Sequence, residues 1–413
     1  MPNPTSPALA RMKMVQGFNT EDGTRPKTAD KADHVLKVAL FTDSDVFAGT
    51  ERHILDLAEG LREFGLMVQI ACPVPSPLAK MAREKEVPIL AIQKGGVMDL
   101  GAIRKLSMLF RSAGLDLVHA HNGRTALSTV LAAIWARTGC CIFTQHFVEP
   151  GRLRCGAIQR LVKGFVHGFV NRRIDRFIAI SAAVRDAMLL RTDAAPVRIT
   201  TIPNGIAKPD TALFANPASI RKELGIEEGV PLIVSVARLE MEKDIPTLIE
   251  AIEHLAVACH GVRCVIVGEG SQRKELERRI LASKLERNVT LAGFRSDAIA
   301  VINACDIFVL PSPAEPFGLV ILEAMALGKP VIAIGNGGPL EIVVHEETGL
   351  LVAPANSNAM ANAIRRLIDS PSEAALMGRA GRCRMEERFS NLRMAREIAS
   401  VYKTALQVVA MKS

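Results

Sequence analysis

Two glutamates separated by seven residues flank the start of a predicted helix. Glu315 precedes Pro316, and Glu323 follows in a run of helix-forming residues. Proline suits the first position of a helix, so we expect the helix to begin at Pro316, with the amides of Gly318 and the next two residues unpaired. Such amides bind anions, and the Glu323 carboxylate can accept hydrogen bonds from two vicinal hydroxyls, as a ribose presents them. The segment therefore predicts a site for a nucleotide that carries a diphosphate.

A parallel sheet is needed to position these residues. The chain alternates apolar runs of strand length with amphipathic segments, a pattern that predicts parallel sheets covered by helices. The expected strands are 38–41, 68–71, 89–92, 117–119, 142–144, 177–180 and 199–202, then 232–236, 264–267, 289–291, 307–310, 331–333 and 350–352. The expected helices include 50–62, 102–111, 124–136 and 181–189. The two series of strands predict an α/β chain with two Rossmann-like domains facing a cleft. Such sheets bind ligands beyond the carboxyl ends of their strands.

The domain boundaries follow from breaks in this alternation. The length of 413 residues exceeds what one ordinary core requires. Residues 1–34 are polar and aperiodic, which predicts a disordered tail. The alternation covers 35–206, lapses over a linker at 207–218, and resumes over 219–390. The final segment, 391–413, is a predicted helix that we expect to cross back to the first domain.

The segment from 315 to 326 resembles the hallmark of the retaining glycosyltransferases of family four, which have the GT-B fold. That hallmark is a glutamate, seven residues and a second glutamate, and the resemblance extends over about residues 38–367. It implies that Glu315 contacts hydroxyls of the donor sugar and that Glu323 holds the ribose. It also implies that Phe317, Gly318 and Leu319 belong to the donor site.

Further matches lie on other expected loops. Arg238 and Lys243 match the family's basic pair for the donor phosphates, and Gly49 matches its glycine turn. Two fixed cations would stabilise the departing nucleoside diphosphate, which makes a metal unnecessary. The turn 337–341 resembles another turn near the donor, whereas 268–270 is interpreted as structural. Alanine or aspartate replaces a common family glycine at three positions: Ala48, Ala237 and Asp244.

Three histidines follow or end expected strands of the first domain. His146 matches a histidine that family members place beside the sugar-transfer site, and the alternative is a strand-end histidine bonded to backbone. His119 and His121 match a family pattern, and their spacing puts them on one face of a strand. They suggest metal ligands, but the sequence reveals no third one. We therefore expect no metal.

The resemblance implies transfer of a hexosyl group from a nucleoside diphosphate sugar to a hydroxyl acceptor, in polysaccharide or glycolipid assembly. Domain 219–390 would hold the donor, domain 35–206 a glycan or lipid-linked acceptor, and no cofactor besides the donor is expected. Catalysis would rest on Glu315, His146, Arg238 and Lys243. Two alternatives remain: a non-hydrolysing nucleotide-sugar epimerase, and an inactive scaffold that binds a nucleotide or a glycan.

The net charge of +8 is uneven along the chain. Residues 1–207 contain 27 Lys and Arg against 18 Asp and Glu, and the remainder contains 24 against 25. Much of the excess lies in 152–176, which is either a helix with a solvated basic face or a patch for anionic lipid. Without a membrane span or signal-peptide core, we expect a cytoplasmic protein, at the inner face of the membrane if the patch binds lipid. Nucleic acid is not an expected partner, because no reading module is present.

Overall fold

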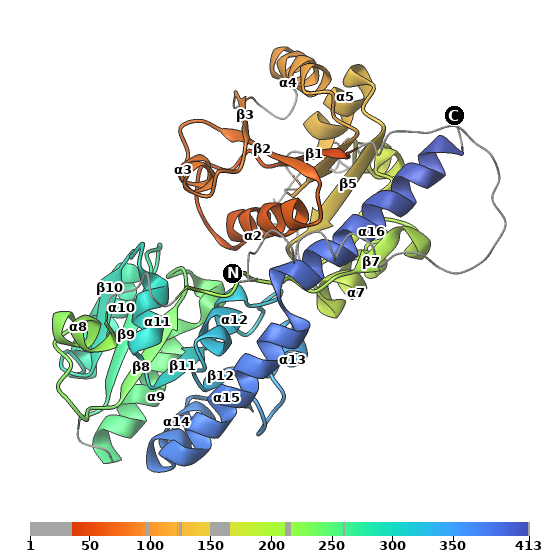
Figure 1. Ribbon diagram of the computed structural model, residues 1–413. Helices are drawn as coiled ribbons and strands as arrows, with labels where there is room; N and C mark the ends of the chain where they lie inside the picture. Colours follow the sequence, from red (N-terminus) through yellow and green to blue (C-terminus); the bar gives the residue numbers. More distant parts are fainter. Residues whose placement is uncertain are drawn as a thin grey trace, which may run out of the picture. The chain divides into compact units, whose positions relative to one another are not determined.

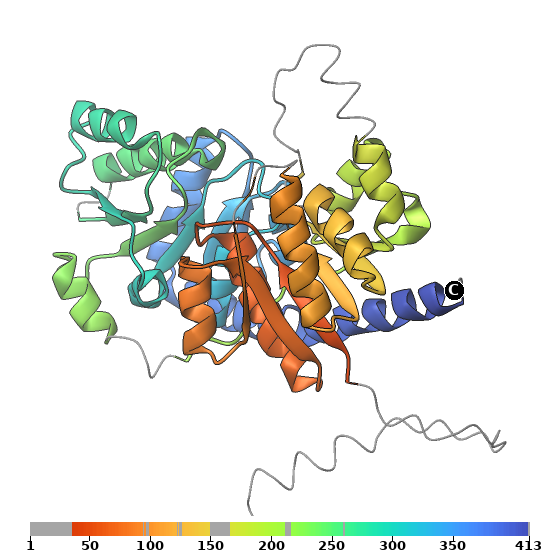
Figure 2. The same ribbon diagram turned by 90° about the horizontal axis from the view of Figure 1, so that it is seen from above.

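The computed structural model describes residues 35–93, 95, 99–121, 123, 126–148, 166–210, 216–258 and 261–411. Two parallel sheets, each with helices packed against it, can be followed in Figures 1 and 2. This arrangement confirms the predicted α/β class with two Rossmann-like sheets. The expected tail 1–34 and residues 152–165 of the basic stretch lie outside the described residues.

The first sheet has seven strands in the order β3-β2-β1-β4-β5-β6-β7. Its strands are β1 (Lys37–Phe41), β2 (Met67–Pro73), β3 (Ile89–Ile92), β4 (Leu117–Ala120), β5 (Cys140–Gln145), β6 (Arg176–Ala179) and β7 (Ile199–Thr201). The helices between them are α2 (Gly49–Glu63), α3 (Pro77–Glu84), α4 (Leu100–Ser112), α5 (Ala126–Ala136), α7 (Ala182–Leu190) and the 3-10 turn η1 (Pro196–Arg198). Residues 166–173 are also helical.

The second sheet has six strands in the order β10-β9-β8-β11-β12-β13. Its strands are β8 (Leu232–Val236), β9 (Arg263–Val267), β10 (Val289–Gly293), β11 (Ile307–Leu310), β12 (Val331–Ile334) and β13 (Leu350–Val352). The helices are α8 (Pro217–Glu223), η3 (Met241–Lys243), α9 (Ile245–Ala258), α10 (Arg273–Ala282), α11 (Ala298–Ala304), α12 (Leu319–Ala326), α13 (Pro339–Ile342), α14 (Ser357–Asp369), α15 (Pro371–Arg388) and α16 (Asn391–Ala410).

Both faces of each sheet are buried. Along β1, Val38 and Leu40 belong to one apolar cluster, and Ala39 and Phe41 belong to another. Along β11, Ile307 and Val309 alternate with Phe308 and Leu310 in the same way. Successive side chains of a strand point to opposite faces, so an apolar layer covers each side. This explains why the strands appear in the sequence as unbroken apolar runs.

The C-terminal helix α16 packs against α2, beside the first sheet. Its buried residues include Met394, Ile398 and Tyr402. The backbone of Ile206 pairs with that of Ser390, just before α16 begins. The end of the chain thus stabilises the layer that carries Gly49.

One expected element begins later than the sequence predicts. Helix α12 starts at Leu319, with Gly318 as its N-cap residue at φ 107°. The left-handed conformation of Gly318 turns the chain before the helix, so the prediction that Pro316 opens the helix is wrong. The expected strands, in contrast, all occur within two residues of their predicted ends.

None of the helices in the described part of the chain combines the length and the apolar character needed to cross a bilayer.

Candidate functional site

The predicted site residues follow the pair of neighbouring strands in each sheet at which the strand order reverses. In the second sheet β8 and β11 are neighbours. The chain continues from β8 to Arg238 and Lys243, and from β11 to Glu315. In the first sheet β1 and β4 are neighbours, and they lead to Gly49 and His121. The strand orders reverse at these pairs, and open α/β sheets bind ligands at such switch points.

An ion pair joins the two loops of the second sheet. Lys243 Nζ lies 2.7 Å from Glu315 Oε2, and the two side chains retain 18% and 13% of their exposure. Arg238 is more exposed and pairs with Glu242 on the same loop, at 2.6 Å. Each of the two cations of the expected phosphate site is therefore paired with a carboxylate. Of these two pairs, the one at Glu315 is better shielded from solvent.

The loop that carries Glu315 is fixed by its neighbours. The Gly338 amide donates to Glu315 O at 2.9 Å, and Asn336 Nδ2 donates to Pro313 O at 2.7 Å. A Cβ on Gly338 would lie 2.2 Å from Phe317 Cα, so only glycine permits this close backbone contact. The turn after β12 thus holds the Glu315 loop in place, which agrees with the position expected for 337–341.

The start of α12 can bind an anion. The Ile321 amide donates to Gly318 O, so the earlier amides of Leu319 and Val320 begin the helix without an intrahelical acceptor. Glu323, about one turn later, is part-buried. Desolvation raises the pKa of its carboxyl, although the charge of Arg52 partly opposes this. A ribose hydroxyl pair that bonds to this carboxylate would replace part of its missing solvation.

Sequence reasoning missed Arg52. It lies in α2 of the first sheet and forms a 2.9 Å ion pair with Asp56. Its pKa is raised because, although desolvation lowers it, the charges of Asp56 and then Glu323 outweigh that effect. The sequence gives no signal for the effect of the Glu323 charge on Arg52, since an arginine on an amphipathic helix normally faces solvent.

Gly49 opens α2 and approaches α12. A Cβ on Gly49 would lie 3.7 Å from Leu319 Cδ1, which is ordinary contact. The two expected donor residues are therefore neighbours, although they belong to different sheets. Another contact between the sheets is the hydrogen bond from the Ala182 amide to Glu341 Oε1, at 2.8 Å.

The three departures from the family glycines fit this backbone. Ala48 has an extended conformation (φ −140°) that any residue adopts. Ala237 is not among the residues with positive φ, and the close contact beside it requires glycine at position 268, where a Cβ would lie 1.9 Å from the Ala237 carbonyl oxygen. Asp244 adopts φ 47°, and its carboxylate accepts a 2.7 Å hydrogen bond from Thr247. Aspartate tolerates this left-handed conformation better than most residues, which explains how it replaces glycine there.

The histidines form one buried cluster. His121 Nδ1 lies 3.3 Å from His146 Nε2, and His53 of α2 joins them, with ligand atoms of all three within 4.8 Å of one another. Burial lowers the pKa of each ring, to about 4 for His53 and well below the usual value for the others. His53 is the third histidine that the sequence did not reveal, because its contact depends on how α2 packs.

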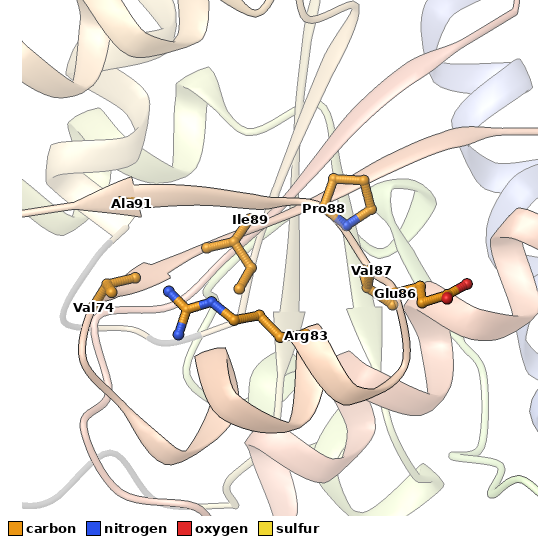
Figure 3. Close-up of a pocket in the computed structure, with 7 residues that line it drawn as sticks. All are labelled: Val74, Arg83, Glu86, Val87, Pro88, Ile89 and Ala91. Carbon is orange, nitrogen blue, oxygen red and sulfur yellow. The ribbon is translucent and has the colours of Figure 1, made fainter.

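Neither described pocket contains these residues. Figure 3 shows one beside β3, lined by Val74, Arg83, Glu86, Val87, Pro88, Ile89 and Ala91. The other lies beneath α8 and α15, with Arg221, Asp306 and Lys329 in its lining. The charged groups of the candidate site, Arg238, Lys243 and Glu315, lie instead at the switch point of the second sheet.

Comparison with known proteins adds to this geometry. Residues 47–208 match the family model Glycosyltransferase Family 4, and residues 217–384 match the model Glycosyl transferases group 1. Glycogen synthase of Mycobacterium tuberculosis is 32% identical over 300 residues, which cover 71% of this chain and 70% of that protein. Alpha-maltose-1-phosphate synthase of the same organism is 30% identical over 399 residues, covering 89% and 99%. The crystal structure of Anabaena HepE in complex with UDP-glucose has a TM-score of 0.78 at 24% identity, covering 89% of this chain and all of that one (100%).

Proposed function

The chain belongs to glycosyltransferase family 4 and transfers a hexosyl group from a nucleotide sugar, and we propose that the donor is a uridine diphosphate hexose. HepE was solved with UDP-glucose, and an Escherichia coli relative at 25% identity is named as a UDP-Gal transferase that acts on a diphosphoundecaprenol-linked sugar. These names support uridine as the base and a glycan or a lipid-linked glycan as the acceptor.

The Lys243–Glu315 ion pair carries the assignment of roles. Lys243 and Arg238 follow β8, and the open amides of α12 follow β11, so a diphosphate at this edge would meet two cations and a helix start. The ion pair with Glu315 holds Lys243 in position, and a charge that is already in position stabilises the leaving diphosphate without reorganisation. Glu323 would hold the ribose and Glu315 the hexose.

Retention of configuration, which the family resemblance implies, requires that the acceptor approach from the side on which the diphosphate leaves. As the bond between the sugar and the diphosphate breaks, the acceptor hydroxyl attacks from the face that the diphosphate leaves. The acceptor proton passes to a diphosphate oxygen, and the positive charges of Lys243 and Arg238 compensate the negative charge that develops there. Glu315 positions both Lys243 and the sugar and forms no bond to the reacting carbon.

The first sheet would supply the acceptor side. His146 lies after β5, and Gly49 brings α2 next to Leu319. If the acceptor is lipid-linked, the basic stretch 152–176 would contact the anionic membrane that carries it. Of that stretch, the described residues Arg172 and Arg173 are exposed. This contact predicts sedimentation with anionic vesicles at low salt, and equal sedimentation with neutral vesicles would contradict it.

A donor panel tests the proposal. Uridine, guanosine and adenosine diphosphate hexoses are offered one at a time, and thermal stabilisation and slow hydrolysis are measured. We expect both effects with a uridine donor and neither with the others. The surface variant Arg278→Ala, whose pair with Glu275 is largely exposed, serves as a control that should behave like the wild type. Hydrolysis of a guanosine or adenosine donor alone would refute the choice of base.

A further inference from the structure

Four histidines lie side by side at the end of the first sheet. His119 lies in β4, and His121 follows that strand directly. His146 follows β5, and His53 belongs to α2. Their exposures are only 0%, 1%, 6% and 1% in that order. Such a group of buried imidazoles is unusual, because burial of a polar ring is costly unless its nitrogens have partners.

His119 differs from the other three. Its Nδ1 lies 2.7 Å from the Tyr402 hydroxyl, and its Nε2 lies 2.7 Å from the Thr144 hydroxyl. Both ring nitrogens are therefore used in structural hydrogen bonds. This residue has no capacity left for another ligand.

The other rings are less fully engaged: His121 Nδ1 and His146 Nε2 lie within hydrogen-bonding distance of each other, at 3.3 Å, and within the described chain three further nitrogens have no partner. Among the described residues, neither nitrogen of His53 has a partner in hydrogen-bonding geometry, and neither does Nε2 of His121. The side-chain oxygen of Asn204 is also buried without a partner. Its amide lies near enough to His53 to oppose slightly the lowering of that ring's pKa by burial. Unsatisfied buried polar atoms of this kind indicate an occupant that the protein chain itself does not supply.

The spacing of the three rings suits a metal ion. Zn²⁺ binds imidazole nitrogens at 2.0–2.1 Å, and in a tetrahedral site this places neighbouring nitrogens about 3.3–3.4 Å apart. The distance between His121 Nδ1 and His146 Nε2 is 3.3 Å. The largest separation among the three ligand atoms is within 4.8 Å, so the third ring would need to move by only about 1.5 Å to complete the set.

The chemistry of the rings agrees with this spacing. An imidazole must be neutral to bind a metal, and burial already favours the neutral form of all three rings. With no sulfur and no carboxylate in the set, the group resembles the imidazole sites that Zn²⁺, Cu²⁺ and Ni²⁺ prefer rather than those of Mg²⁺ or Ca²⁺. Three protein ligands would leave a fourth position for water or for the Asn204 oxygen.

We propose that His53, His121 and His146 bind one divalent transition-metal ion of the Zn²⁺ type. The ion would connect α2 to the loops after β4 and β5. It would thereby hold the helix that begins at Gly49 and fix the orientation of His146. This role is separate from the charge compensation assigned to Lys243 and Arg238, so the site can exist whether or not the donor assignment is correct.

The test uses the full chain without a polyhistidine tag. The protein is treated with a chelator, desalted, and titrated with Zn²⁺ by calorimetry and with Co²⁺ by visible absorption. We expect one ion per chain, a rise in melting temperature with added Zn²⁺, and the intense Co²⁺ bands of a tetrahedral site. Loss of an outer partner of a metal ligand costs about 10–100-fold in affinity, so His53→Gln and His121→Gln should each cost at least 100-fold.

Two matched variants serve as controls. His119→Gln should retain the affinity, because both nitrogens of His119 are bonded to Tyr402 and Thr144. His345→Gln tests surface binding and should also have no effect. Absence of stoichiometric binding, or affinity that survives both His53→Gln and His121→Gln, would overturn the proposal. If those variants do not fold, the wild-type Co²⁺ spectrum decides, since a weak octahedral spectrum would equally refute the site.

Discussion

Glu315→Gln should separate nucleotide binding from sugar transfer. At 2.7 Å the attraction between Lys243 and Glu315 is about 6 kcal/mol for an effective dielectric constant of about 20. Both side chains retain some exposure, so desolvation and screening reduce the net value to about 1.5–3 kcal/mol, the range of hydrogen bonds between charged groups. A diphosphate must share the Lys243 ammonium with this carboxylate. Removing the carboxylate charge should therefore leave UDP affinity unchanged or increase it, by up to about 10- to 150-fold if the whole net value is released.

Sugar transfer should respond in the opposite direction. Without its carboxylate, Glu315→Gln loses the contacts that position the hexose, and transfer should fall by about 100-fold. Lys243→Ala should weaken both UDP binding and transfer, the latter by about 10²–10³-fold. Calorimetry with UDP and a hydrolysis assay measure the two effects, with Glu275→Gln as a surface control from an exposed ion pair. If Glu315→Gln weakened UDP binding as strongly as Lys243→Ala, the idea of competition for the ammonium would be refuted.

Three further perturbations test other parts of the site. Gly49→Ala should fold normally, because the added Cβ meets only ordinary contact at 3.7 Å, but it should weaken UDP binding by about tenfold. Gly338→Ala should instead lower the unfolding free energy by about 1–3 kcal/mol. Equal melting temperatures of the two variants would contradict this contrast. Because burial raises the pKa of Glu323, UDP affinity should begin to fall at a higher pH than it would with an exposed glutamate. Glu323→Gln should remove that step and raise the melting temperature. A titration with no difference between the two proteins would contradict the ribose role. Tyr402→Phe leaves His119 Nδ1 without its 2.7 Å partner and should cost about 1–3 kcal/mol in urea unfolding, whereas no loss would show that the ring finds another partner.

Most of the fold could be predicted because buried parallel strands have a simple sequence pattern. The central strands are covered on both faces, so their residues form apolar runs that differ from the amphipathic helices around them. The start of α12 could not be predicted in the same way. Pro316 is compatible with a helix start, but the positive φ of Gly318 places the first helical residue at Leu319, and the sequence records no φ.

The candidate site was predictable where its residues belong to one segment and unpredictable where it depends on packing. Glu315 and Glu323 lie on one loop and the helix that follows it, so the sequence alone places them close together, and their roles toward the donor stay predictions. Arg52 and His53 are consecutive on α2, and nothing local distinguishes them from other polar residues of an amphipathic helix. Glu323, whose charge acts on Arg52, and His121, which lies beside His53, belong to other elements and come near only when the chain folds. A single helix therefore carries residues that approach both Glu323 and the histidine cluster, so we expect a displacement of α2 to disturb both.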